Sequence, residues 1–90
     1  MYKRIYSREN YQYKVGEFME IKKEIYYFVM ILNTIAKEYS MSIYETYNYL
    51  NKYKGIEFLT EFYDVEHTLN TDDVVEDVLA ICNRNGGILK

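Results

Sequence analysis

The sequence predicts an all-α protein: a small bundle of four helices, two long and two short, with an N-terminal extended arm. Three observations predict this class. Apolar residues in Glu17–Tyr39 recur at alternating steps of three and four, which is the spacing of one helix face. Ser42 and Glu45 have the spacing of a capping box, which starts a helix. Asp72 and Asp73 form an acidic pair of the kind favoured by the positive end of a helix dipole.

The arm is expected to comprise residues 1–16, and the single helical domain residues 17–90. Tyr11, Tyr13 and Val15 alternate with polar residues, and Gly16 ends the alternation. This is a weak strand pattern. Two readings remain open, a short extended segment lying on the bundle and an arm with little structure of its own.

The first helix is expected to be the centre of the fold. Its inward stripe carries Phe18, Ile21, Ile25, Phe28, Leu32, Ile35 and Tyr39. Between Ile25 and Leu32 no polar residue interrupts the run. A helix that is apolar on nearly every face needs cover from several sides, so we expect other elements to surround this one.

The second helix is predicted to begin at Ile43, with Ile43, Tyr47 and Leu50 facing inward. Gly55 is predicted to end it as a left-handed cap. A short third helix is expected over Ile56–Asp64. Both are shorter than an isolated helix that is stable in water, so they must pack against the first helix.

Residues 66–70 are expected to form a loop, and the last helix to be capped by Asn70 or Thr71. Asn85, Gly86 and Gly87 are expected to end it. Its buried face is predicted to contain Val74, Val78 and Ile81, with Val75, Leu79 and Cys82 beside them.

Composition limits the classes of function. The chain has 90 residues, a net charge of −3 and one cysteine, so disulfides and cysteine-rich zinc sites are not expected and a cytoplasmic location is. The apolar run is too short to span a membrane. An acidic chain is a poor binder of duplex DNA. The arm is the basic exception, with Lys3, Arg4, Arg8 and Lys14 against Glu9.

Residues that could carry chemistry are few. His67 is the only histidine, and Asp64 precedes it by three positions. A nucleophilic or zinc site would need further partners, so both residues are assigned to capping helix ends and holding the loop. The acidic pairs near Asp72 lack the spacing of a calcium loop. We therefore expect no enzyme activity, no metal, no cofactor and no small-molecule substrate.

The second and third helices have the connection length of a helix-turn-helix. The segment that would read DNA is Ile56–Phe62, which has two glutamates, no basic residue and bulky apolar side chains. Such a helix is unsuited to contacting bases or phosphates. A nucleic-acid-binding regulator that uses the basic arm is kept as the alternative function.

Tyrosines supply the strongest functional indication. Several lie off the predicted inward stripes, and tyrosine is enriched at protein interfaces. The candidate interface comprises Tyr26, Tyr27, Met30, Ile31, Tyr44, Tyr49 and Tyr53. Two occupants of this face are left open, a partner protein or second copy of the chain, and the chain's own arm.

From Glu17 onward the chain resembles a family of small bacterial proteins known as domain of unknown function 3791. The most specific part of the likeness is Tyr63-Asp64-Val65 followed by His67-Thr68, which supplies the family-motif residues Tyr63, Asp64, His67 and Thr68. The resemblance implies a short cytoplasmic helical protein. It also implies, for members encoded beside toxin-like enzymes, an antitoxin-like or accessory role. The function expected here is a non-enzymatic protein–protein interaction module that binds a protein partner or forms a homo-oligomer.

Overall fold

The computed structural model describes residues 15–89, in which every regular element is a helix. The predicted all-α class is therefore confirmed for this part of the chain. The helices are α2 (Val15–Glu38), α3 (Ile43–Lys52), α4 (Gly55–Glu61), α5 (Tyr63–Glu66) and α6 (Thr71–Arg84). The strand pattern at Tyr11 and Tyr13 lies outside the described residues, whereas Val15 and Gly16 belong to α2 instead of ending an arm.

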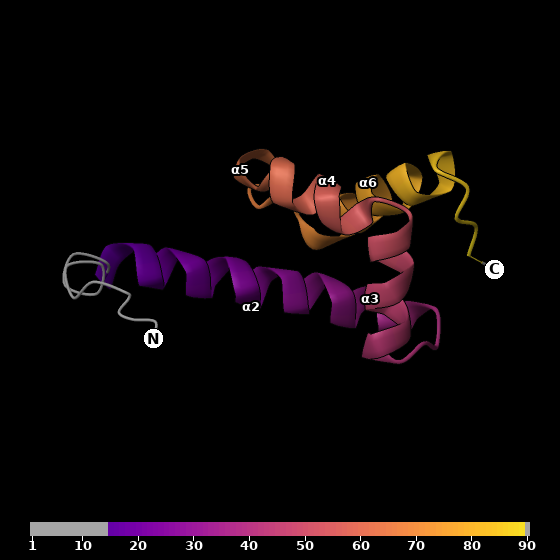
Figure 1. Ribbon diagram of the computed structural model, residues 1–90, viewed down its shortest axis with the longest axis horizontal. Helices are drawn as coiled ribbons and strands as arrows, with labels where there is room; N and C mark the ends of the chain where they lie inside the picture. Colours follow the sequence, from indigo (N-terminus) through magenta and orange to yellow (C-terminus); the bar gives the residue numbers. More distant parts are fainter. Residues whose placement is uncertain (1–14, 90) are drawn as a thin grey trace, which may run out of the picture.

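The helices form two levels joined by an upright connection (Figure 1). α2 runs along one level, α3 rises from its C-terminal end, and α4, α5 and α6 lie above the C-terminal part of α2. The N-terminal part of α2 extends beyond α5. The core lies between the two levels and takes residues from four helices: Ile31, Leu32, Ile35, Leu50, Leu59, Val74, Val75, Val78 and Cys82.

α2 ends in a left-handed turn. Ser40 has a φ of 55°, and the amide of Met41 donates to the carbonyl of Ala36 over 2.8 Å. This six-to-one hydrogen bond identifies a Schellman motif. It turns the chain sharply enough for α3 to begin at Ile43.

The predicted capping box at the start of α3 is confirmed. The amide of Glu45 donates to the Ser42 hydroxyl over 3.0 Å, and the Glu45 carboxylate accepts from the Ser42 amide over 2.9 Å. The inward face of α3 differs from the prediction, because Thr46 and Leu50 are buried while Ile43 and Tyr47 are exposed. Thr46 can be buried because its hydroxyl donates to the Ser42 carbonyl over 2.8 Å.

The prediction that Gly55 caps α3 in a left-handed conformation is wrong. Lys54 has the left-handed conformation, with a φ of 71°, and Gly55 is the buried first residue of α4. A Cβ at Gly55 would lie 2.9 Å from both Cys82 Sγ and Leu50 Cγ. Gly55 is therefore required for the close approach of α4 to α3 and α6.

The prediction of one helix over Ile56–Asp64 is also wrong, because the chain bends at Phe62, whose φ is −108° and ψ 22°. The bend separates α4 from α5. It lets the ring of Tyr63 pack edge-on against two rings of α2, with centroids 5.3 Å from Tyr27 and 6.3 Å from Phe28. α4 therefore ends at Glu61, and the bend allows Tyr63 to pack against α2.

The final helix begins and ends as predicted. The Asn70 side chain accepts from the amide of Asp73 over 2.9 Å. At the other end Gly86 has a φ of 97°, and the amide of Gly87 donates to the Cys82 carbonyl. Of the predicted buried face, Val74, Val75, Val78 and Cys82 are buried, while Leu79 and Ile81 are half-buried at its margin.

Candidate interaction surface

The N-terminal half of α2 exposes part of the stripe that was predicted to face inward. Ile21 and Ile25 are 54% and 52% exposed, whereas Leu32 and Ile35 of the same stripe are buried. The prediction that this stripe is covered along its whole length is therefore wrong. The reason is length: the 24 residues of α2 rise about 36 Å, whereas the 14 residues of α6 rise only about 21 Å.

Further apolar side chains widen this exposed region. Val29 continues the line of Ile21 and Ile25 at the four-residue spacing that keeps side chains on one helix face. Other exposed apolar residues follow on the adjacent face. We define the α2 stripe as Met19, Ile21, Ile25, Tyr26, Val29 and Met30, all of which are exposed. Lys22 lies among these side chains on the helix surface. Apolar side chains gathered on one exposed helix face are typical of an interaction site.

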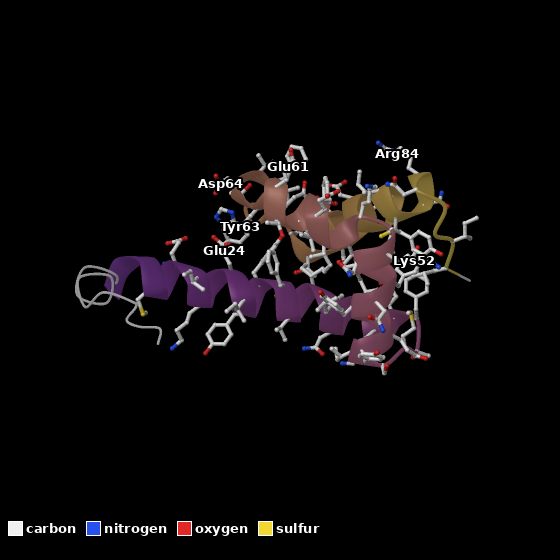
Figure 2. The ribbon with its side chains drawn as sticks, viewed as in Figure 1. Glu24, Lys52, Glu61, Tyr63, Asp64 and Arg84 are labelled. Carbon is white, nitrogen blue, oxygen red and sulfur yellow. The ribbon has the colours of Figure 1, made fainter. Side chains whose placement is uncertain are left out.

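An acidic edge lies beside the α2 stripe, where α2 meets α5. Glu20 and Glu24 of α2 and Asp64 of α5 all lie close enough to Tyr63 for their negative charges to raise the pKa of its hydroxyl, although burial raises it most. In Figure 2, Glu24 points toward the level that carries Tyr63 and Asp64. We call Glu20, Glu24 and Asp64 the acidic edge. It offers negative charge next to apolar surface.

The candidate interface residues divide into two groups. Tyr26, Met30 and Tyr44 are exposed, Tyr26 and Tyr44 to 66% and 75%. Ile31 is fully buried in the core, so it cannot contact a partner in this fold. The ring of Tyr27 packs against the rings of Phe28 and Tyr63, with centroids 6.1 Å and 5.3 Å away.

Tyr49 and Tyr53 hold the C-terminal segment. The Tyr49 hydroxyl donates to the Gly87 carbonyl over 2.7 Å, and burial raises its pKa to about 12. The ring of Tyr53 lies against the α-carbon of Gly87, where a Cβ would meet ring atom Cγ at 2.5 Å. These two tyrosines therefore have a structural role inside the chain. Sequence periodicity could not predict this role, because both tyrosines contact Gly87, which lies beyond the last helix.

The family-motif residues form the end of α5. The ring of His67 stacks on that of Tyr63, with centroids 4.5 Å apart and planes 9° apart. His67 Nδ1 lies 2.6 Å from the Tyr63 carbonyl oxygen, so Nδ1 carries the proton and donates. The Thr68 hydroxyl donates to the Val65 carbonyl over 2.6 Å. The carbonyls of Tyr63 and Val65 also accept the backbone amides of His67 and Thr68, so each side chain adds a second hydrogen bond at the end of α5.

Asp64 does not share this arrangement, because it is exposed on the acidic edge. The acid–base pair that the spacing of Asp64 and His67 allowed is therefore not assembled around the imidazole. In residues 15–89 no three histidine, cysteine or acidic side chains come together as metal ligands. None of the described helices has both the length and the apolar character required to cross a membrane.

Two buried polar atoms without a hydrogen-bond partner were missed by sequence reasoning, one in Glu66 and one in Tyr27. Glu66 is 6% exposed and its Oε1 has no hydrogen-bond partner, nor has the buried hydroxyl of Tyr27. Burial raises the pKa of Glu66, and the neighbouring carboxylate of Asp77 raises it further. Burial, together with Glu66, also raises the pKa of Tyr27 to about 12. A protonated Glu66 can donate to Asp77, which links α5 to α6.

Cys82 is a core residue. It is fully buried against Gly55, and burial raises the pKa of its thiol to about 11. A thiol that stays protonated at neutral pH is neither a good nucleophile nor a metal ligand. The position that sequence analysis gave it among apolar residues agrees with this structural role.

Comparison with known proteins identifies the family. The model of the family described as "Protein of unknown function (DUF3791)" matches residues 26–85. The match covers two thirds of the chain, so the protein belongs to this family and the resemblance is confirmed. No curated protein and no solved structure matches the chain. The match begins at Tyr26, one residue before Tyr27, whose ring packs against Tyr63 of α5. Residues 15–25 of α2 therefore lie outside the matched region.

Proposed function

We propose that this protein is a non-enzymatic interaction module, an antitoxin-like or accessory subunit that binds another protein through the α2 stripe. The observation that supports the proposal best is the exposure of Ile21 and Ile25 on a stripe whose continuation forms the core. Burying two isoleucines at a partner contributes on the order of 1.5–3 kcal/mol each when their burial is complete. This free energy of burial would favour association with a partner protein.

Several contacts support a non-enzymatic role as part of the proposal. His67 Nδ1 is engaged by the Tyr63 carbonyl and its ring by the Tyr63 ring. Burial keeps the Cys82 thiol protonated. The imidazole of His67 and the thiol of Cys82 are thus engaged in contacts within the chain. A cytoplasmic location for the protein and its partner belongs to the same proposal.

Self-association is a second candidate because the exposed apolar side chains of the α2 stripe could pack against the same side chains of a second copy. Two copies could align the projecting parts of α2 with their bundles at opposite ends. In an antiparallel pair centred on Lys23, Lys22 of one copy lies at the level of Glu24 of the other, so charge alone does not decide against a second copy.

Capture from native lysate tests the proposal. The bait is the full chain, the test variant carries Ile21→Ser and Ile25→Ser, and the matched control carries Ile88→Ser at an exposed isoleucine in the C-terminal segment. We expect a specific protein to be captured by the parent and the control and lost by the double variant. Light scattering after size exclusion separates a partner from a second copy. A monomer that captures nothing, or captures equally with the double variant, would contradict the proposal.

A further inference from the structure

A surface cavity lies among α4, α5 and α6, the helices that form the upper level in Figure 1. Its volume of about 250 Å³ is below the roughly 300–1,000 Å³ of sites for drug-sized ligands, so it suits a smaller molecule. Its walls combine three charged and three apolar side chains: Phe58, Glu66, Asp77, Ala80, Ile81 and Arg84. No member of the α2 stripe contributes to it.

Glu66 supplies a buried acceptor at this cavity. Its side chain is 6% exposed, and within residues 15–89 its Oε1 has no hydrogen-bond partner. Burial and the charge of Glu66 raise the pKa of the nearby Tyr27 hydroxyl, yet this hydroxyl is also unpartnered and does not donate to Oε1. A buried acceptor without a donor is unfavourable. A ligand that brings a donor to Glu66 is therefore favoured.

Glu66 and Asp77 together give the cavity an acidic wall. Their carboxyl groups lie within hydrogen-bond reach of each other. When both are ionised each can only accept, so neither satisfies the other. When they share a proton, the pair still retains one negative charge. In either state the wall attracts a cationic donor.

Arg84 places a positive charge at the other end of the cavity. It follows Asp77 by seven positions on α6, so the two side chains start from the same helix face about 10.5 Å apart along the axis. Among the described residues Arg84 forms no ion pair. In Figure 2 it extends outward from α6, on the side away from α2. The cavity thus offers opposite charges at its two ends.

We propose that this cavity binds a small zwitterion, a free α-amino acid with an apolar side chain. Its ammonium group lies at Glu66 and Asp77, its carboxylate at Arg84, and its side chain against the apolar wall. An α-amino acid with a charge-assisted hydrogen bond at each end spans about 9 Å. This span is close to the axial separation of Asp77 and Arg84, and the long Arg84 side chain can adapt to the difference. The site is separate from the α2 stripe and does not rest on the proposed function.

Three ligands with one side chain test the assignment: leucine, leucinamide and N-acetylleucine. At pH 6 leucine carries both charges, leucinamide only the ammonium and N-acetylleucine only the carboxylate. Shifts of backbone amide signals during titration give the affinity and the location together. We expect leucine to bind with a Kd on the order of 1 mM and to shift the signals of Ile81 and Arg84, with those of Ile21 and Ile25 unchanged.

Each blocked ligand should bind about tenfold more weakly than leucine, because one charged hydrogen-bonding end is lost. Equal affinities for leucine and leucinamide would show that the carboxylate is not recognised and would overturn the proposal. It is also overturned if leucine, valine and methionine all leave the amide signals around the cavity unchanged.

Variants assign the two ends. Arg84→Gln should weaken leucine binding about tenfold and leave leucinamide binding unchanged, whereas Asp77→Asn should weaken the binding of both. Glu76→Gln and Lys52→Gln, at exposed sites outside the cavity, are matched controls and should leave every affinity unchanged. An equal loss of leucine and leucinamide binding in Arg84→Gln would contradict the placing of the carboxylate at Arg84.

Discussion

Two adjacent residues, Lys54 and Gly55, have the roles opposite to those their identities predict. Lys54 adopts the left-handed conformation that glycine accepts without steric cost, while Gly55 lies where there is no space for a Cβ. The sequence located the turn correctly, but the left-handed conformation was assigned to Gly55 because glycine usually adopts it. Which of two neighbours must be small depends on Cys82 and Leu50, which are distant in sequence.

Substitutions at these two positions should therefore have opposite effects on stability. Lys54→Gly should stabilise the protein by up to about 1 kcal/mol, because a non-glycine residue in this conformation costs roughly that much. Gly55→Ala should destabilise it by about 1–3 kcal/mol through overpacking. Urea unfolding measures both. Equal effects, or a stabilising Gly55→Ala, would contradict the assignment.

Glu66 should make the stability of the protein depend on pH. Burial and Asp77 raise its pKa in the folded state. The stability that Glu66 contributes is then fully present below its unfolded pKa and is lost as the pH rises through its folded pKa. Glu66→Gln keeps a donor to Asp77 and cannot ionise. We expect this variant to be more stable than the parent at pH 8, with a smaller difference at pH 4.

Unfolding at both pH values measures the effect of Glu66→Gln. Asp64→Asn is a matched control, because Asp64 is an exposed carboxylate on the same helix. A parent whose advantage over the variant grows as the pH rises would show that Glu66 is stabilised in its charged form. The sequence could not predict this behaviour, since the approach of Glu66 to Asp77 depends on the packing of α5 on α6.

At the scale of the element, α2 is a single helix in two environments. Its spacing predicted the helix itself correctly, and Leu32 and Ile35 of the predicted stripe are buried. Periodicity identifies which face of a helix is apolar but not how far along it other elements reach. Comparing the lengths of the predicted helices could have shown that part of the stripe lacks cover.

Truncating one side chain in each half of this stripe should change the stability of the protein by different amounts. Leu32→Ala should cost on the order of 2–5 kcal/mol, because it leaves a cavity in the core. Ile25→Ala should change stability by about 0.5 kcal/mol or less, as expected for a surface position. Thermal or chemical unfolding of both variants gives the comparison. A large loss from Ile25→Ala in the monomer would mean that other elements cover this half of α2.

At the scale of the whole molecule, the family region, residues 26–85, contains the buried core, and the exposed α2 stripe crosses its N-terminal boundary. The sequence predicted the helical class, the capped start of α3, and both ends of α6. It did not predict the division of the tyrosines between structure and surface. Tyr49 and Tyr53 contact Gly87, and such contacts between distant segments leave no period in the sequence.

The most direct test of this account is the exchange of backbone amide hydrogens along α2 in the monomeric protein. We predict that Ile31–Ala36 exchange only through global unfolding, whereas Met19–Ile25 exchange through local opening at a much lower free energy. Equal opening free energies from Met19 to Ala36 would show that the bundle covers the whole helix, and the surface proposed for a partner would not exist.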